Sequence, residues 1–237
     1  ATLQQAGFKP GDALAVCAGT STDYVALFLG ALRAGVVVAP LAPSSTAQQL
    51  VDMARDADAR LVFIDSSSAA LSVAWPVPTV SLDAAAFEAW LLPAGAQPAP
   101  VAIDPSWPFN IIYSSGTTGT PKGIVQPHAM RWAHIQRAGL SGYDAATVTM
   151  IATPLYSNTT LVCLIPTLAY GGCAVLMPKF DALQYLQLAE AHRATHTMLV
   201  PVQYRRLMAH PEFDRFDLRA FRAKFSTSAP FHAELKA

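Results

Sequence analysis

Short apolar segments alternate with amphipathic ones along nearly the whole sequence, and this alternation restricts the fold more than any other feature. Ala13 to Cys17 is typical of a buried strand. Asp23 to Ala34 carries apolar residues at helical spacing and is followed by Gly35, a typical helix end. Strands separated by helices predict mainly parallel sheets covered by helices on both faces. The expected fold class is therefore α/β.

The same reasoning assigns most of the remaining chain. Thr46 followed by Gln49 predicts a capping box at the start of a helix that reaches about Asp58. Further strands are expected at 36–39, 61–64, 109–113, 123–126, 148–152, 174–177, 197–200 and 224–227, and further helices at 128–139, 159–170, 183–192 and 202–208. The Pro- and Ala-rich stretch at 93–100 is the best linker. It predicts a first lobe at 1–105 and a second lobe at 106–237.

Composition excludes several classes of protein. Hydrophobic residues make up 52% of the 237 residues, which is too many for a disordered chain. The 16 basic and 16 acidic side chains balance, so no overall positive field attracts nucleic acid. Cys17, Cys163 and Cys173 have apolar neighbours and are expected to be reduced core residues. Since no signal peptide is visible and the apolar stretch 161–177 contains Pro166 and two glycines, we expect a cytoplasmic protein without a membrane span.

One loop carries most of the chemical information. Residues 114–123, Ser-Ser-Gly-Thr-Thr-Gly-Thr-Pro-Lys-Gly, combine five hydroxyl side chains, three glycines and one lysine after an apolar strand. Backbone N–H groups and hydroxyls can surround phosphate oxygens, while Lys122 neutralises their charge. The loop is not a Walker A motif, because Pro121 precedes the lysine and a strand-like segment follows it. A Rossmann fingerprint is also absent.

Residues 113–123 closely resemble the phosphate-loop signature of AMP-forming adenylating enzymes, which include acyl-CoA synthetases, luciferases and peptide-synthetase adenylation domains. Residues 29–43, 153–157 and 228–230 resemble further segments of the same family. The resemblance implies the α/β part of a large N-terminal domain. The rest of that domain, and a mobile C-terminal domain with a second lysine, are expected to lie outside this sequence. A complete alanine-rich domain is the alternative.

The family's chemistry implies ATP, Mg²⁺ and coenzyme A as cofactors or co-substrates. A carboxylate attacks the α-phosphorus of ATP, and a thiol then takes the acyl group from acyl-AMP. The resemblance implies nucleotide binding by Ser114, Ser115, Gly116, Thr117, Thr118, Gly119, Thr120, Lys122, Ser228, Ala229 and Pro230. Lys122 is the expected catalytic residue. No metal ligand is named, because the family's metal-associated glutamate is expected outside this sequence.

The substrate segment departs from the family pattern. Tyr156, Ser157 and Asn158 are the expected substrate-binding residues, and they include no carboxylate to pair with an amino acid's ammonium group. Many acyl-CoA synthetases have histidine and glycine where Ser157 and Thr160 stand here. An apolar fatty or aryl acid is therefore expected as substrate. Transfer to a carrier protein, an inactive nucleotide-binding fragment and a homo-oligomer remain open alternatives.

Overall fold

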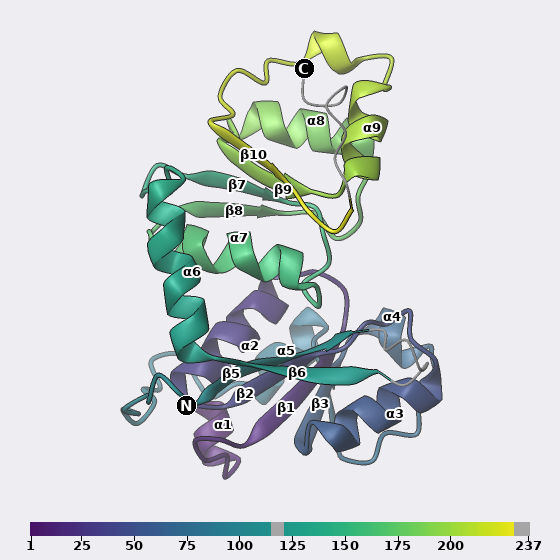
Figure 1. Ribbon diagram of the computed structural model, residues 1–237. Helices are drawn as coiled ribbons and strands as arrows, with labels where there is room; N and C mark the ends of the chain where they lie inside the picture. The colour runs from purple at the N-terminus through teal and green to yellow at the C-terminus, as the bar shows by residue number, and fades with distance from the viewer. Residues whose placement is uncertain (115–120, 230–237) are drawn as a thin grey trace. The chain divides into compact units, whose positions relative to one another are not determined.

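The computed structural model describes residues 1–114 and 121–229. The chain forms two compact units, Ala1–Arg131 and Trp132–Ala237, and each is described by itself. Both combine a sheet with covering helices (Figure 1). The predicted α/β class is confirmed.

The first unit contains a six-stranded sheet in the order β4-β3-β1-β2-β5-β6. Its strands are β1 (Ala13–Cys17), β2 (Val37–Pro40), β3 (Ala59–Ile64), β4 (Thr79–Ser81), β5 (Pro108–Ser114) and β6 (Lys122–Pro127). Neighbouring strands from β4 to β5 are parallel, and β6 alone in this sheet runs antiparallel, next to β5. The loop at 114–123, the phosphate-type loop, therefore joins the adjacent strands β5 and β6, which form a hairpin.

Helices cover both faces of this sheet, because successive side chains of a strand point to opposite faces and the apolar ones lie on both. The helices of this unit are α1 (Thr2–Gln5), α2 (Thr22–Arg33), α3 (Ala47–Asp56), α4 (Ser66–Ala69) and α5 (Ala84–Trp90). Helix α6 (His128–Leu140) begins at the end of the first unit and continues into the second. On one face, Leu50 and Met53 of α3 pack with Ala15 of β1. On the other, Phe28 of α2 lies 5.9 Å from Phe109 between ring centroids. The predicted capping box of α3 is confirmed by reciprocal hydrogen bonds between Thr46 and Gln49.

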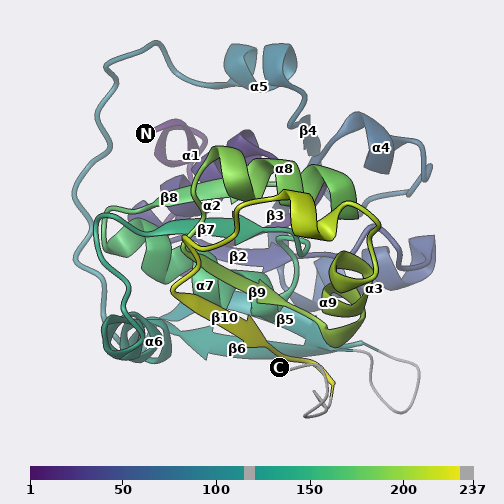
Figure 2. The ribbon, with the colours of Figure 1, turned by 90° about the horizontal axis from the view of Figure 1, so that it is seen from above.

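The second unit contains a four-stranded sheet in the order β10-β9-β7-β8, and all its pairs are parallel. Figure 2 shows these strands side by side in that order. The elements are β7 (Val148–Ile151), α7 (Asn158–Ala169), β8 (Cys173–Leu176), α8 (Ala182–Ala191), β9 (His196–Leu199), α9 (Pro201–Met208), the 3₁₀ helix η1 (Phe213–Arg215) and β10 (Ala223–Ser226). Helix α7 covers one face, and α8 and α9 cover the other (Figure 1).

Three expectations need correction. The units divide after Arg131 and not at residue 105, because β5 pairs with β2 and so places the hairpin in the first sheet. The Pro-rich stretch 93–100 is therefore a connection within the first unit, and Gln4 exchanges two hydrogen bonds with Ala99 of this stretch. Cys173 is exposed, unlike the buried Cys17 and Cys163. Among the described residues, no helix has the length and apolar character needed to cross a membrane.

Candidate functional site

The phosphate-type loop begins and ends on a regular antiparallel ladder. Ser114 of β5 pairs with Lys122 of β6, and both residues are exposed. The prediction of a loop between two strands is confirmed. Ser115, Gly116, Thr117, Thr118, Gly119 and Thr120 lie outside the described residues. The structure thus brings together the two ends of the predicted site, a hydroxyl and an ammonium group on neighbouring strands.

The base of this hairpin is held by helix α3, a contact that the sequence did not predict. The Tyr113 hydroxyl lies 2.7 Å from Asp56 Oδ2 and 2.9 Å from the Met53 carbonyl oxygen, and its proton is directed toward these acceptors. Burial and the neighbouring Asp56 carboxylate raise the pKa of Tyr113 far above its usual value, so the hydroxyl stays protonated and can donate. Tyr113 directly precedes Ser114, so this contact positions the start of the loop.

Gly123 lies at the other end of the loop, next to the side chain of Asp56, the last residue of α3. A Cβ atom on Gly123 would lie 2.9 Å from Asp56 Oδ2, 3.0 Å from Ile111 Cγ2 and 3.2 Å from Tyr113 Cε1. Real Cβ atoms do not tolerate such a distance to Asp56 unless something shifts. The glycine after Lys122 is therefore needed for packing at the base of the hairpin.

A buried polar cluster lies further along the same hairpin. Asn110 and Gln126 are cross-strand partners, and both accept hydrogen bonds from the guanidinium of Arg131, which is only 2% exposed. Burial lowers the pKa of Arg131 to about 10. The ring of His128 packs at 5.0 Å from Phe109, and burial lowers the pKa of His128.

The second group of predicted residues lies in the second unit, at the carboxyl edge of its sheet. Strand β8 lies on one side of β7, whereas β9 and β10 lie on its other side, so the direction of the strand connections reverses between β7 and β9. Open α/β sheets bind ligands at such a reversal, outside the carboxyl ends of the strands. The segment 153–157 leaves β7 at this point. Topology therefore supports a ligand site at the predicted substrate segment, independently of the motif.

Tyr156, Ser157 and Asn158 are half-buried and lead directly into α7. Ser157 is the N-cap residue of α7, and its hydroxyl accepts from the Thr159 amide at 3.3 Å. Asn158 is the first residue of the helix. These contacts give the start of α7 a defined conformation.

Two sets of side-chain contacts, which the sequence did not predict, hold the substrate segment. The Thr160 hydroxyl lies 2.7 Å from the Thr153 hydroxyl and 2.6 Å from the Pro154 carbonyl oxygen. Gln203 of α9 donates to the Ala152 carbonyl at 3.0 Å and accepts from the Val200 amide at 3.1 Å. Gln203 thus bridges the ends of β7 and β9. The sequence could indicate that Gln203 caps the start of α9, because it lies three residues after Val200. It could not indicate that the same side chain also reaches the end of β7.

The segment resembling an adenylate contact follows β10. Ser228 has a φ of 71°, in the left-handed region that favours glycine, and its hydroxyl lies 3.3 Å from that of Thr159. Ala229 is exposed, and Pro230 lies outside the described residues. The structure thus brings Ser228 next to the start of α7, so two of the predicted segments meet within the second unit.

No metal site is evident in the part of the chain that the structure describes. Within 1–114 and 121–229, no group of three or more His, Cys, Asp or Glu side chains is arranged to hold a metal ion. Mg²⁺ relies mainly on water and phosphate oxygens and needs only one or two protein carboxylates.

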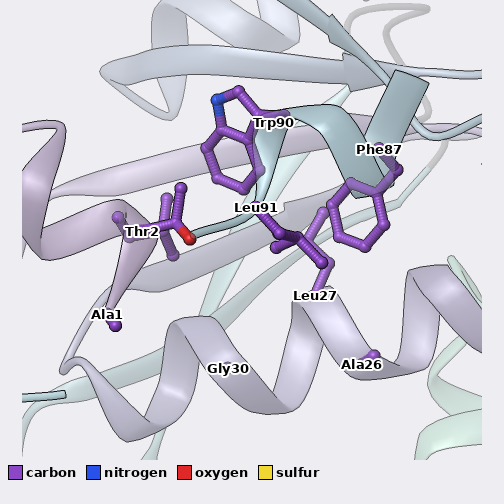
Figure 3. Close-up of a pocket in the computed structure, with 9 residues that line it drawn as sticks. Ala1, Thr2, Ala26, Leu27, Gly30, Phe87, Trp90 and Leu91 are labelled. Atoms are coloured by element: carbon purple, nitrogen blue, oxygen red, sulfur yellow. The ribbon is translucent and has the colours of Figure 1, made fainter. Parts of the chain in front are cut away.

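A pocket of about 130 Å³ lies in the first unit, away from the loop residues discussed above. Its lining is mainly apolar, and Phe87, Trp90 and Leu91 lie across from Leu27 of α2 (Figure 3). The Thr2 hydroxyl accepts from the Leu92 amide at 3.0 Å and is therefore already engaged. The lining contains no charged side chain, so it does not suit phosphate groups.

Comparison with known proteins agrees with the resemblance. The model of the AMP-binding enzyme family matches residues 1–237. The chain therefore belongs to the AMP-binding enzyme family. A feruloyl-CoA synthase of Amycolatopsis sp is 30% identical over 243 residues, covering 98% of this chain and 47% of the relative.

Two other proteins extend this comparison. A fatty acid–[acyl-carrier-protein] ligase, ScoC of Streptomyces coeruleorubidus, is 26% identical, covering 98% of this chain and 47% of its own length. The N-terminal domain of FACL13 from Mycobacterium tuberculosis has a TM-score of 0.86 at 25% identity, covering 98% of this chain and 61% of that structure. The chain thus spans about half the length of the curated relatives it matches.

Proposed function

We propose that this chain carries the phosphate loop and part of the acid site of an ATP-dependent ligase that forms acyl-AMP and then acyl-CoA. The observation that carries the proposal is the pairing of Ser114 with Lys122 at the mouth of a loop rich in glycine and hydroxyl groups. Family membership and relatives that are CoA ligases support the reaction type. Activity of the whole protein is part of this proposal.

In the first half-reaction, a carboxylate oxygen forms a bond to the α-phosphorus of ATP, and the bond to the pyrophosphate oxygen breaks. The protein contributes mainly position and charge, since phosphoryl transfer needs little covalent help. Lys122 and the loop hydroxyls hold the β- and γ-phosphates and stabilise the charge that develops on pyrophosphate. Mg²⁺ enters with ATP. A thiol then attacks the acyl carbon, and AMP leaves.

The acid is bound, in this proposal, at the carboxyl edge of the second sheet by Tyr156, Ser157 and Asn158. Ser228 and its neighbours Ala229 and Pro230 contact the adenylate. The position of Ser157 and Asn158 at the reversal between β7 and β9 supports this assignment. Fatty and aryl acids are the substrate types to compare, because the relatives include ligases of both.

The decisive experiment is carboxylate-dependent ATP–pyrophosphate exchange, measured on the polypeptide as its gene encodes it. The acids tested are fatty acids, aryl acids, dicarboxylates and amino acids. Exchange that depends on one class of acid supports adenylation. Absence of exchange with every acid, from protein shown to be folded by circular dichroism, refutes the proposed reaction.

A carrier protein is the second candidate for the acyl acceptor, because one relative is a fatty acid–[acyl-carrier-protein] ligase. The two acceptors are distinguished by mass spectrometry of the product with CoA alone, a phosphopantetheinylated carrier alone, and both. For the chain of residues 1–237 by itself, we propose nucleotide binding without turnover. Equal unfolding temperatures with and without Mg·ATP would refute this binding.

A further inference from the structure

The first turn of α9 is hydrogen-bonded to the carboxyl ends of three strands in the second unit. The Gln203 side chain donates to the Ala152 carbonyl, directly after β7, and accepts from the Val200 amide, directly after β9. The Tyr204 hydroxyl donates to the carbonyl oxygen of Phe225 in β10 at 2.8 Å. Two neighbouring side chains of one helix therefore fix the points where the chain leaves β7, β9 and β10.

The Gln203 contact begins where the pairing of β7 with β9 stops. Strand β7 pairs with β8 at four positions, along its full length, whereas its pairing with β9 ends at Met150 and Thr197. Ala152 is only 4% exposed, and buried backbone carbonyl groups almost always accept a hydrogen bond. The side-chain amide of Gln203 takes the place of a further peptide pair and links the two strand ends.

Two of these strand ends lead into segments assigned to the substrates. Ala152 directly precedes the segment 153–157, which contains Tyr156, the first of the proposed acid-binding residues. Phe225 lies shortly before Ser228, the first of the proposed adenylate-binding residues. The Gln203 contact is therefore placed to act on the acid segment, and the Tyr204 contact on the adenylate segment.

A hydrogen bond at the start of a segment restricts the conformations that the following residues can adopt. Without it, the segment spends part of its time in conformations that do not bind. The apparent affinity for a ligand falls in proportion to the fraction of molecules in the binding conformation. Loss of either contact should therefore weaken the binding of one substrate more than that of the other.

We propose, on the basis of the proposed function, that Gln203 and Tyr204 are positioning residues for the two substrates of adenylation. Gln203 positions the acid segment through the Ala152 carbonyl, and Tyr204 positions the adenylate segment through the Phe225 carbonyl. Each acts through the backbone and not by contact with the reacting atoms. The start of α9 thus aligns the two segments whose ligands must meet for the carboxylate to reach the α-phosphorus.

The test is ATP–pyrophosphate exchange on the polypeptide as its gene encodes it, with the acid that gives the fastest exchange. Gln203→Met keeps the length of the side chain and removes its amide. We expect this variant to raise KM for the acid about 10-fold and to change KM for ATP about 2-fold or less. Tyr204→Phe removes one hydroxyl and should give the reverse pattern, with KM for ATP raised about 3- to 10-fold.

The matched control is Tyr185→Phe. The Tyr185 hydroxyl donates to Thr197 at 2.8 Å, so it ties α8 to β9 within the same sheet and before the strand end. This variant is expected to lower the unfolding temperature and to leave both KM values unchanged. A loss of stability alone therefore does not reproduce the opposite shifts expected for Gln203→Met and Tyr204→Phe.

The outcomes separate this inference from the proposed function. Absence of exchange with every acid, from folded unaltered protein, refutes both together. Exchange by the unaltered protein, with both KM values shifted equally or not at all in the Gln203 and Tyr204 variants, refutes this inference alone. If Gln203→Met does not fold, Gln203→Asn replaces it, because the shorter amide keeps a polar group but cannot span both partners.

Discussion

Each unit has an Arg–Asp ion pair at the amino edge of its sheet, whereas the functional groups at the carboxyl edge differ between the two units. At the amino edge, Arg60 pairs with Asp12 in the first unit, and Arg222 pairs with Asp144 in the second. At the carboxyl edge, the first unit carries a lysine on a hairpin, whereas the second carries hydroxyl and amide groups. Charge near phosphate and neutral polarity near an organic acid are chemically reasonable assignments.

The largest expected effect comes from removing the charge that distinguishes the first unit. Lys122→Ala is expected to lower the rate of ATP–pyrophosphate exchange by about 100- to 1000-fold, because a preorganised electrostatic contact is lost. Folding should be preserved, since Lys122 is exposed. The control is Lys224→Ala on β10, also exposed. Equal exchange by the two variants would contradict the role of Lys122.

The close approach of α3 to the hairpin gives the next largest effect. Gly123→Ala places a Cβ atom 2.9 Å from Asp56 Oδ2, so the Asp56 carboxylate must move and its hydrogen bond with the Tyr113 hydroxyl is disturbed. We expect a loss of about 1–3 kcal/mol in the free energy of unfolding and a higher KM for ATP. Urea denaturation measures the first and exchange kinetics the second.

The control for Gly123→Ala is Gly30→Ala, because a Cβ atom at Gly30 on α2 meets no other atom within 4 Å. Alanine should stabilise the helix there by about 0.5–1 kcal/mol. A Gly123→Ala protein as stable as the unaltered one would show that the hairpin base is not tightly packed.

Backbone strain is the feature to test in the second unit. Ser228→Gly and Ser228→Ala both remove the hydroxyl that contacts Thr159, and only glycine relieves the φ of 71°. The glycine variant is expected to be about 1 kcal/mol more stable than the alanine variant, as the left-handed conformation costs residues with a Cβ atom. Equal unfolding midpoints in urea would mean that this segment relaxes without strain.

The smallest effect concerns the amino edge of the second sheet. The Arg222 guanidinium holds the pKa of Asp144 well below its usual value. A lowered native pKa adds stability above the unfolded value of about 3.9, and this contribution is lost as pH falls. Asp144→Asn should therefore lower the unfolding temperature slightly at pH 7, with a smaller difference at pH 3. Asp214→Asn, exposed in η1, serves as control.

Sequence patterns predicted the longer helices and strands, because the apolar residues on the buried face of each element repeat with the period of that element. The predicted strand at 13–17 coincides with β1, and the predicted helix at 128–139 differs from α6 by one residue. Elements α1, α4, β4 and α5 were not predicted. They are short or Ala- and Ser-rich, so local hydrophobic periodicity is weak, and packing partners such as Phe63 for Phe87 stabilise them.

The sequence by itself determined the α/β class, the loop at 114–123 and the family, because these depend on local periodicity and on a long motif. Only the tertiary structure decided that β5 and β6 belong to the first sheet, that Asp56 holds Tyr113, and that Gln203 bridges β7 and β9. These features join residues 51 to 72 positions apart in the sequence, and local patterns carry no record of such pairings.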